Sequence, residues 1–214
     1  MRDAFFLWYI HDQAWHFKLA KQAAGTLLDL TQKDVCILTT DKLVPEEQRE
    51  DLQNLGCKIY TFDPILPTWP LNFHWKYEIT KMRIFQILGY DRIIALDTDQ
   101  YPRGNIDEMF DTIYEQNKIY IGVHPIIPNT CNDHYMAFHF EEHVRIYLWK
   151  KFCDLFFNSC NTAHVLNQLS YHGSGTTIGI LESFFNEYLI RQDPEFFVHG
   201  PDEVRLSKEH EAHE

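Results

Sequence analysis

Residues 91–111, DRIIALDTDQYPRGNIDEMFD, decide how this chain folds. The apolar run 93–96 predicts a buried strand that ends at Asp97, and a second acid, Asp99, follows two positions later. In open α/β sheets, ligands bind at the carboxyl ends of the strands. Side chains two positions apart in an extended chain point the same way, so we expect Asp97 and Asp99 to face one point. Because close carboxylates repel each other unless a cation joins them, the pair predicts a site for Mn²⁺ or Mg²⁺.

A bare pair of acids at this spacing often marks only a solvated loop, so the flanking sequence has to decide between the two interpretations. A buried strand precedes the pair. Residues 105–110, on its other side, predict a helix that packs back onto the sheet. Both flanks favour a functional site.

Outward from this stretch, short apolar runs alternate with amphipathic stretches, which predicts an α/β fold with a mostly parallel sheet and helices on both faces. The predicted strands are residues 4–10, 35–39, 58–62, 92–96, 118–123 and 176–180. The predicted helices are residues 14–30, 45–55, 75–88, 105–110 and 141–157. Proline and turn residues predict loops at 63–73 and 125–134.

Composition limits what the chain can bind. The 214 residues are 45% hydrophobic and have a formal net charge of -12, which fits one sizeable domain and disfavours nucleic acid as a partner. The five scattered cysteines indicate neither a zinc site nor disulfides, and we expect reduced, partly buried thiols and a cytoplasmic location. The apolar run 4–10 is too short for a membrane span.

The quoted stretch resembles the glycogenin-like glycosyltransferases of the GT-A superfamily. TKMRIF at 80–85, HGSGTTIGILES at 172–183 and PDE at 201–203 are similar to three further segments of that family, in the same order. In size and in its anchorless start, the chain also resembles a glycosyltransferase domain encoded by a large chlorella virus, in which case the host cytoplasm is the expected location. The resemblance implies one GT-A (Rossmann-like) domain at 1–206, with a charged tail at 207–214 that leaves room for further domains of a longer polypeptide.

The resemblance also implies an activity and a site. It implies transfer of a sugar from a UDP-sugar donor to a glycan or glycoprotein acceptor, with retention of configuration and Mn²⁺ or Mg²⁺ as cofactor. The implied metal ligands are Asp97 and Asp99, and the implied catalytic residues are Asp202 and Lys81, with Asp193 or Glu203 as alternatives to Asp202. The implied donor-binding residues are Tyr9, Ile10, His11, Asp12, Trp15, Lys81, Asp97, Thr98, Asp99, Ser174 and Gly175.

Three points stay open. The family's third metal ligand, a histidine near the end of the domain, has no matching segment in this sequence, so water or a group outside the chain would take its place. Lys81 could instead be a solvated helix lysine. Two alternative functions remain: a non-catalytic module that binds nucleotide sugars, and a haloacid-dehalogenase-like phosphatase, which is disfavoured because that family has its acidic pair on the first strand.

Overall fold

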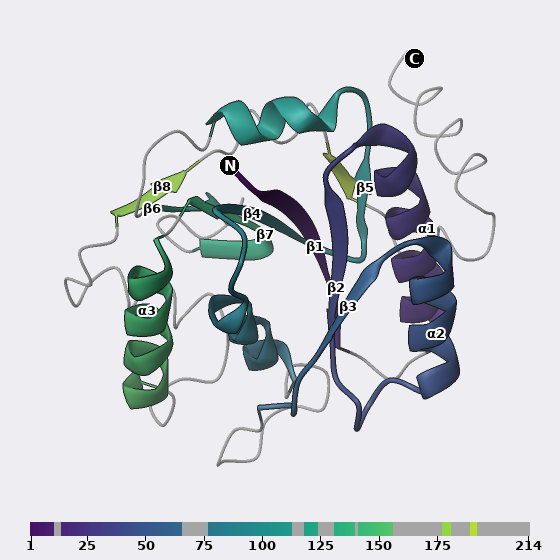
Figure 1. The fold of residues 1–214 in the computed structure, drawn as a ribbon, viewed down its shortest axis with the longest axis horizontal. Helices are drawn as coiled ribbons and strands as arrows, with labels where there is room; N and C mark the ends of the chain where they lie inside the picture. The colour runs from purple at the N-terminus through teal and green to yellow at the C-terminus, as the bar shows by residue number, and fades with distance from the viewer. Residues whose placement is uncertain are drawn as a thin grey trace, which may run out of the picture.

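A computed structural model describes residues 1–10, 14–65, 77–112, 118–123, 131–139, 141–155, 177–180 and 189–191. Strands and helical segments alternate over residues 3–97, as the sequence predicted (Figure 1). The strands are β1 Asp3–Tyr9, β2 Asp34–Thr39, β3 Lys58–Thr61, β4 Arg92–Asp97, β5 Gln100–Pro102, β6 Lys118–Val123, β7 Cys131–His139, β8 Thr177–Ile180 and β9 Leu189–Arg191. The helical segments are α1 Ala14–Leu30, α2 Glu46–Leu55, η1 Glu78–Gln86, η2 Ile106–Thr112 and α3 Glu142–Leu155. None of these helices is long and apolar enough to cross a membrane.

The main sheet has the strand order β3-β2-β1-β4-β7-β6-β8. Neighbouring strands among β3, β2, β1 and β4 pair in parallel, as do β6 and β8. Strand β7 runs antiparallel to both of its neighbours, β4 and β6. A second small sheet joins β5 and β9 in antiparallel fashion, directly after the acidic pair. The predicted mostly parallel sheet is therefore confirmed.

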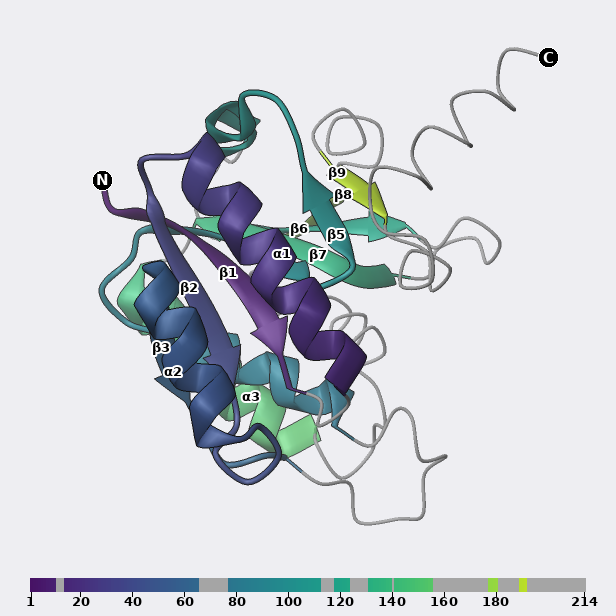
Figure 2. The same ribbon diagram turned by 90° about the vertical axis from the view of Figure 1, so that its right-hand side faces the viewer.

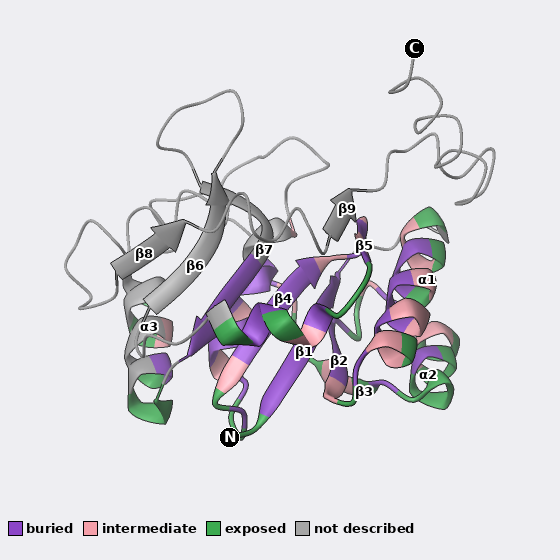
Figure 3. Cartoon of the chain, turned by 90° about the horizontal axis from the view of Figure 1, so that it is seen from above, coloured by how far each residue is buried: buried purple, intermediate pink, exposed green. Residues whose placement is uncertain are grey.

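Helices cover both faces of the sheet, and two apolar cores result (Figure 2). Successive residues of β1 point to opposite faces: Phe5 and Leu7 pack in the core with α1, α2 and η2, whereas Phe6 and Trp8 pack in the core with η1. The central strands are buried along almost their whole length (Figure 3). Burial on both faces explains why these strands are continuous apolar runs rather than alternating ones.

Two predicted elements differ in detail. The helix predicted at 75–88 is a 3₁₀ helix, η1, within its described part, and the predicted loop at 125–134 is wrong at its end because β7 already begins at Cys131. The Asn132-Asp133 pair suggested a turn, but the strand accommodates it where the pairing of β7 with β6 shifts between Ile121 and Gly122. Residues 105–110 do pack back onto the sheet, since Ile106 of η2 is fully buried.

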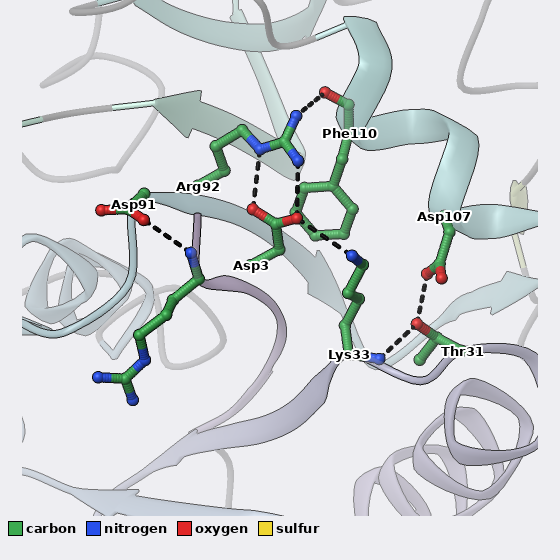
Figure 4. Close-up of polar contacts among 8 residues, drawn as sticks. Asp3, Thr31, Lys33, Asp91, Arg92, Asp107 and Phe110 are labelled. Atoms are coloured by element: carbon green, nitrogen blue, oxygen red, sulfur yellow. Dashed lines mark hydrogen bonds and ion pairs between the residues drawn. The ribbon is translucent and has the colours of Figure 1, made fainter.

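At the edge where β1 and β4 begin, charged side chains join neighbouring strands (Figure 4). Asp3 accepts two hydrogen bonds from Arg92, at 2.8 Å from Nε and 2.7 Å from Nη2, and Lys33 lies 3.3 Å from the same carboxylate. Arg92 also donates to the carbonyl oxygen of Phe110 at 2.8 Å. Burial alone raises the pKa of Asp3, but the hydrogen bonds and charges of Arg92 and Lys33 outweigh it and hold that pKa below its ordinary value. We call Asp3, Lys33 and Arg92 the amino-edge network.

Candidate functional site

The carboxyl ends of the parallel strands meet at the opposite edge of the sheet. The register pairs Trp8 of β1 with Asp97 of β4, and Tyr9 of β1 with Thr39 of β2. Asp97 is the last residue of its strand, as the sequence predicted. The first acid of the pair therefore lies at the edge where ligands bind in open α/β sheets.

Lys81 of η1 forms an ion pair with this first acid. Its Nζ lies 2.7 Å from Oδ1 and 3.0 Å from Oδ2 of Asp97. The Lys81 side chain is 2% exposed and the Asp97 side chain 18% exposed. A lysine this deeply buried is not a solvated helix lysine, so that alternative is wrong. A buried ammonium needs a partner of opposite charge, and Asp97 is that partner. The carboxylate predicted to bind a metal ion is therefore already paired with a cation.

The position of Lys81 follows from the packing of η1. On either side of Lys81 in the chain, Thr80 and Met82 are fully buried, and Met82 belongs to the core on that face of the sheet. The Thr80 hydroxyl accepts a hydrogen bond from the backbone N–H of Ile65 at 3.0 Å. The ring of Trp8 lies against the ammonium, with its centroid 5.2 Å from Lys81 Nζ. This distance is within the range of a cation–π interaction.

The second acid, Asp99, lies in the turn between β4 and β5 rather than in an extended strand. The sequence argument that both carboxylates share one direction assumed an extended chain, and that assumption is wrong for residues 98 and 99. The chain turns here because β5 leaves the main sheet to pair with β9. Gln100 donates from Nε2 to Oδ1 of Asp99 at 3.2 Å, and Thr98 between the acids is buried.

The donor set of this edge fits a divalent metal. Asp97 and Asp99 provide hard carboxylate oxygens, and Mg²⁺ binds through one or two carboxylates together with substrate phosphates and water. No group of three or more His, Cys, Asp or Glu side chains that could hold a metal ion occurs within the described ranges. Asp97 already binds a cation, the Lys81 ammonium. We call Lys81, Asp97 and Asp99 the carboxyl-edge site.

The other predicted site residues fall into three groups: buried, exposed and outside the described residues. Tyr9 and Ile10 are buried, and the Tyr9 hydroxyl donates to Gln48 at 2.5 Å, so only their backbones could meet a ligand. Trp15 is 40% exposed and stacks on His16 with 3.5 Å between ring centroids. The remaining predicted site residues lie outside the described residues: His11, Asp12, Ser174, Gly175 and Asp202.

Sequence reasoning missed Trp8 and Gln100. Trp8 looked like an ordinary core residue, and its place beside Asp97 follows only from the strand register. Gln100 comes directly after the acidic pair, but nothing in the sequence showed that the chain turns there. In both cases the missing information was tertiary structure: the strand register for Trp8 and the turn of the chain for Gln100.

The two cysteines in the buried core, Cys36 and Cys57, are poor nucleophiles at neutral pH. Burial raises the pKa of Cys36 to about 12 and that of Cys57 to about 11. The thiolate is the reactive form of cysteine, so both side chains stay inert. Cys36 and Cys57 are buried, as the sequence led us to expect, while Cys153 is exposed.

Comparison with known proteins gives a short but clear sequence match. No family model matches the chain. One stretch is 36% identical over 73 residues to galactinol synthase 5 of Arabidopsis thaliana and 38% identical over 72 residues to galactinol synthase 7 of the same plant. Each match covers 32% of this chain and 22% of the relative, so the similarity spans about a fifth of the relatives' length.

Solved structures match over most of the chain. The glycosyltransferase GlyE of Streptococcus pneumoniae has a TM-score of 0.57 at 14% identity, over 85% of this chain and 45% of GlyE. The galactosyltransferase LgtC, solved with donor and acceptor sugar analogs, has a TM-score of 0.57 at 13% identity, over 83% of this chain and 73% of LgtC. A Bacillus anthracis protein assigned as a glucose-1-phosphate thymidylyltransferase has a TM-score of 0.53 at 11% identity, over 84% of this chain and 87% of that protein.

At these identities the structural matches establish the fold, and the fold is GT-A, as the sequence predicted. The fold is shared by glycosyltransferases and by the thymidylyltransferase match, so the fold alone does not decide the activity. The glycogenin-like grouping and the resemblance to a viral domain stay predictions.

Proposed function

We propose that the chain is a metal-dependent glycosyltransferase that transfers a sugar from a UDP-sugar donor to a glycan or protein acceptor, with retention of configuration. The main observation in its favour is the buried ion pair of Lys81 with Asp97, one residue before the turn that contains Asp99. The GT-A fold and the sequence similarity to galactinol synthases support the same activity.

In this proposal, Asp97 and Asp99 hold Mn²⁺ or Mg²⁺ through their carboxylates. The metal supplies positive charge at the leaving nucleoside diphosphate, as Lewis acids do in such transfers. Lys81 provides a second, fixed positive charge beside Asp97 and would hold the phosphates as a point charge. Because the Lys81 side chain is buried, this charge is only weakly screened by solvent.

Trp15 is the described side chain best placed to bind the nucleotide base. It is 40% exposed, near the start of α1, and it comes after the carboxyl end of β1. An exposed aromatic ring can stack on a base of any kind, so it contributes affinity rather than base specificity. The proposed role of Asp202 beside the sugar rests on the family resemblance alone.

The proposal is tested by measuring UDP release from UDP-sugars. UDP-galactose is the first donor, because the sequence relatives are galactinol synthases and LgtC is a galactosyltransferase; UDP-glucose and UDP-xylose come next. We expect UDP release that needs Mn²⁺, stops with excess chelator and falls by about 100-fold or more in Asp99→Asn. The matched control is Asp51→Asn, an exposed acid of α2 whose ion-pair partner Lys21 is also exposed, and it should leave the rate unchanged.

Each alternative function gives a different result in the same assay. Tight UDP binding without release of UDP from any UDP-sugar, whichever acceptor is present, identifies a non-catalytic binding module and contradicts the proposal. Release of inorganic phosphate from phosphate esters identifies a phosphatase. The proton NMR spectrum of the first-formed glycoside then distinguishes retention from inversion.

A further inference from the structure

We propose that Trp8 is a positioning residue for donor binding. Its indole face would hold the Lys81 ammonium at the carboxyl-edge site while the Asp97 carboxylate ligates the metal that binds the diphosphate. This inference rests on the proposed function and adds to it a residue that acts through Lys81. Trp8 itself lies near the end of β1, in register with Asp97 on β4.

A buried ammonium needs stabilisation on more than one side. Lys81 and Trp8 are each 2% exposed, so neither side chain has enough contact with water to solvate the charge. Asp97 provides one partner, at 2.7 Å from Nζ. The Trp8 ring provides another, at 5.2 Å from Nζ to its centroid, and tryptophan is the best aromatic partner for a cation, with the strongest effect where water is excluded.

The two partners differ in how they respond when the site is loaded. A carboxylate that ligates a divalent ion gives part of its negative charge to that ion, and the ion repels a nearby ammonium. The Trp8 face has no lone pair that a hard metal ion would take, so its contact with Lys81 persists. Trp8 would therefore keep the ammonium in place while Asp97 serves as a metal ligand.

The ring face of Trp8, rather than its N–H group, accounts for a tryptophan at this position instead of another apolar residue. Trp8 Nε1 is buried and has no hydrogen-bond partner among the described residues. A buried, unpaired donor is unfavourable, and a phenylalanine would fill an apolar position without it. The contact of the ring face with Lys81 offsets this cost.

The test compares Trp8→Phe and Trp8→Leu with wild type by calorimetric titration of UDP at saturating Mn²⁺. We expect Trp8→Leu to weaken the binding of UDP by about tenfold. Trp8→Phe, which keeps a ring face, should weaken it by about threefold or less. The affinity for UMP, which lacks the second phosphate, should fall less than the affinity for UDP. The matched control is Trp149→Leu: Trp149 packs against the same core and lies 5.1 Å from the Arg83 guanidinium, and its loss should leave the UDP affinity unchanged.

A double-mutant cycle distinguishes positioning from mere packing. In the Lys81→Met background, Trp8→Leu should cause no further loss of UDP affinity, because the ammonium that the ring holds is gone. Equal losses in both backgrounds, equal losses in the Phe and Leu variants, or an unchanged UDP affinity in Trp8→Leu would overturn the inference. Should Trp8→Leu not fold, the cycle is measured with Trp8→Phe, whose smaller loss must likewise vanish in Lys81→Met. Wild type that binds no UDP with Mn²⁺ would overturn the proposed function and this inference together, whereas the preceding outcomes overturn this inference alone.

Discussion

The two edges of the main sheet each contain an ion pair involving β4, but the pairs differ in which partner, the acid or the cation, is exposed to solvent. At the amino edge, Arg92 makes two hydrogen bonds to Asp3 and a third to a backbone carbonyl, and the Asp3 side chain is 3% exposed. At the carboxyl edge, the cation Lys81 is buried while Asp97 is 18% exposed. The acid of the first pair is enclosed by the fold, and the acid of the second is open to a further ligand.

The groups that surround each end of β4 explain this difference. The amino edge is closed by the side chain of Lys33 and by the η2 carbonyl that receives Arg92. The carboxyl edge continues into a turn that contains Asp99, and the chain leaves the main sheet there. The same chemistry therefore stabilises the fold at one edge and leaves a charged, accessible site at the other.

The largest expected effect is on stability, in the variant Arg92→Met. It leaves the buried Asp3 carboxylate without its main partner, and breaking such a pair costs about 3–5 kcal/mol. We expect urea denaturation to show this loss, while the folded variant binds UDP with Mn²⁺ as wild type does. A large loss of UDP affinity with little loss of stability would contradict the division between the two edges.

The opposite pattern is expected for Asp99→Ala at the carboxyl edge. Metal-dependent UDP affinity should fall by about 100-fold, which corresponds to roughly 2.7 kcal/mol. The free energy of unfolding should change by less than about 1 kcal/mol, because Asp99 is a partly exposed turn residue. Titration calorimetry and urea denaturation on the same preparation measure both quantities. Unfolding of this variant would make Asp99 a structural residue, and undiminished UDP binding would remove it from the carboxyl-edge site.

A pH series on Asp3→Asn sharpens the contrast from the side of the amino edge. The pKa of Asp3 is lower in the folded chain than in the unfolded chain, so its charge stabilises the fold above the unfolded-state pKa of about 3.9. This contribution is lost as the pH falls through the lower, folded-state pKa. We expect Asp3→Asn to be less stable than wild type by about 2 kcal/mol near neutral pH, with the difference shrinking below about pH 4. A difference that stays constant between about pH 7 and about pH 3 would show that the Asp3 charge contributes nothing.

The smallest effect is expected where an ion pair is exposed on both sides. Lys21 and Asp51 lie 2.9 Å apart, with side chains 48% and 50% exposed. Solvent and salt screen such a pair, so Lys21→Ala should change the free energy of unfolding by less than about 1 kcal/mol and leave UDP binding unchanged. A loss as large as that of Arg92→Met would mean that burial does not distinguish the pairs.

The sequence predicted the elements whose signal is local. The apolar strand before Asp97 and the return of residues 105–110 to the sheet were both readable from residue type and spacing. The beginning of β7 was not, because its Asn132-Asp133 pair is a turn signal that strand pairing overrides.

For the site, the sequence indicated residue identity but not geometry. The burial of Lys81 depends on Asp97 and Trp8, which are distant in the chain and meet only through the packing of η1 on the sheet. The turn at Asp99 depends on β9, which lies far along the chain from β5. Such long-range pairings leave no local pattern, so residue spacing could propose a metal site without showing how its charges are arranged.

The central claim is that the carboxyl-edge site binds a nucleoside diphosphate together with a divalent metal. A thermal-shift titration of wild type with UDP, with Mn²⁺ present and then with excess chelator, tests it most directly. At about 100 times the dissociation constant, UDP should stabilise the fold by roughly 2.7 kcal/mol, and the shift should vanish with chelator and in Asp99→Ala. No shift with UDP or any other nucleoside diphosphate, or a shift that chelator and Asp99→Ala leave intact, would contradict the claim.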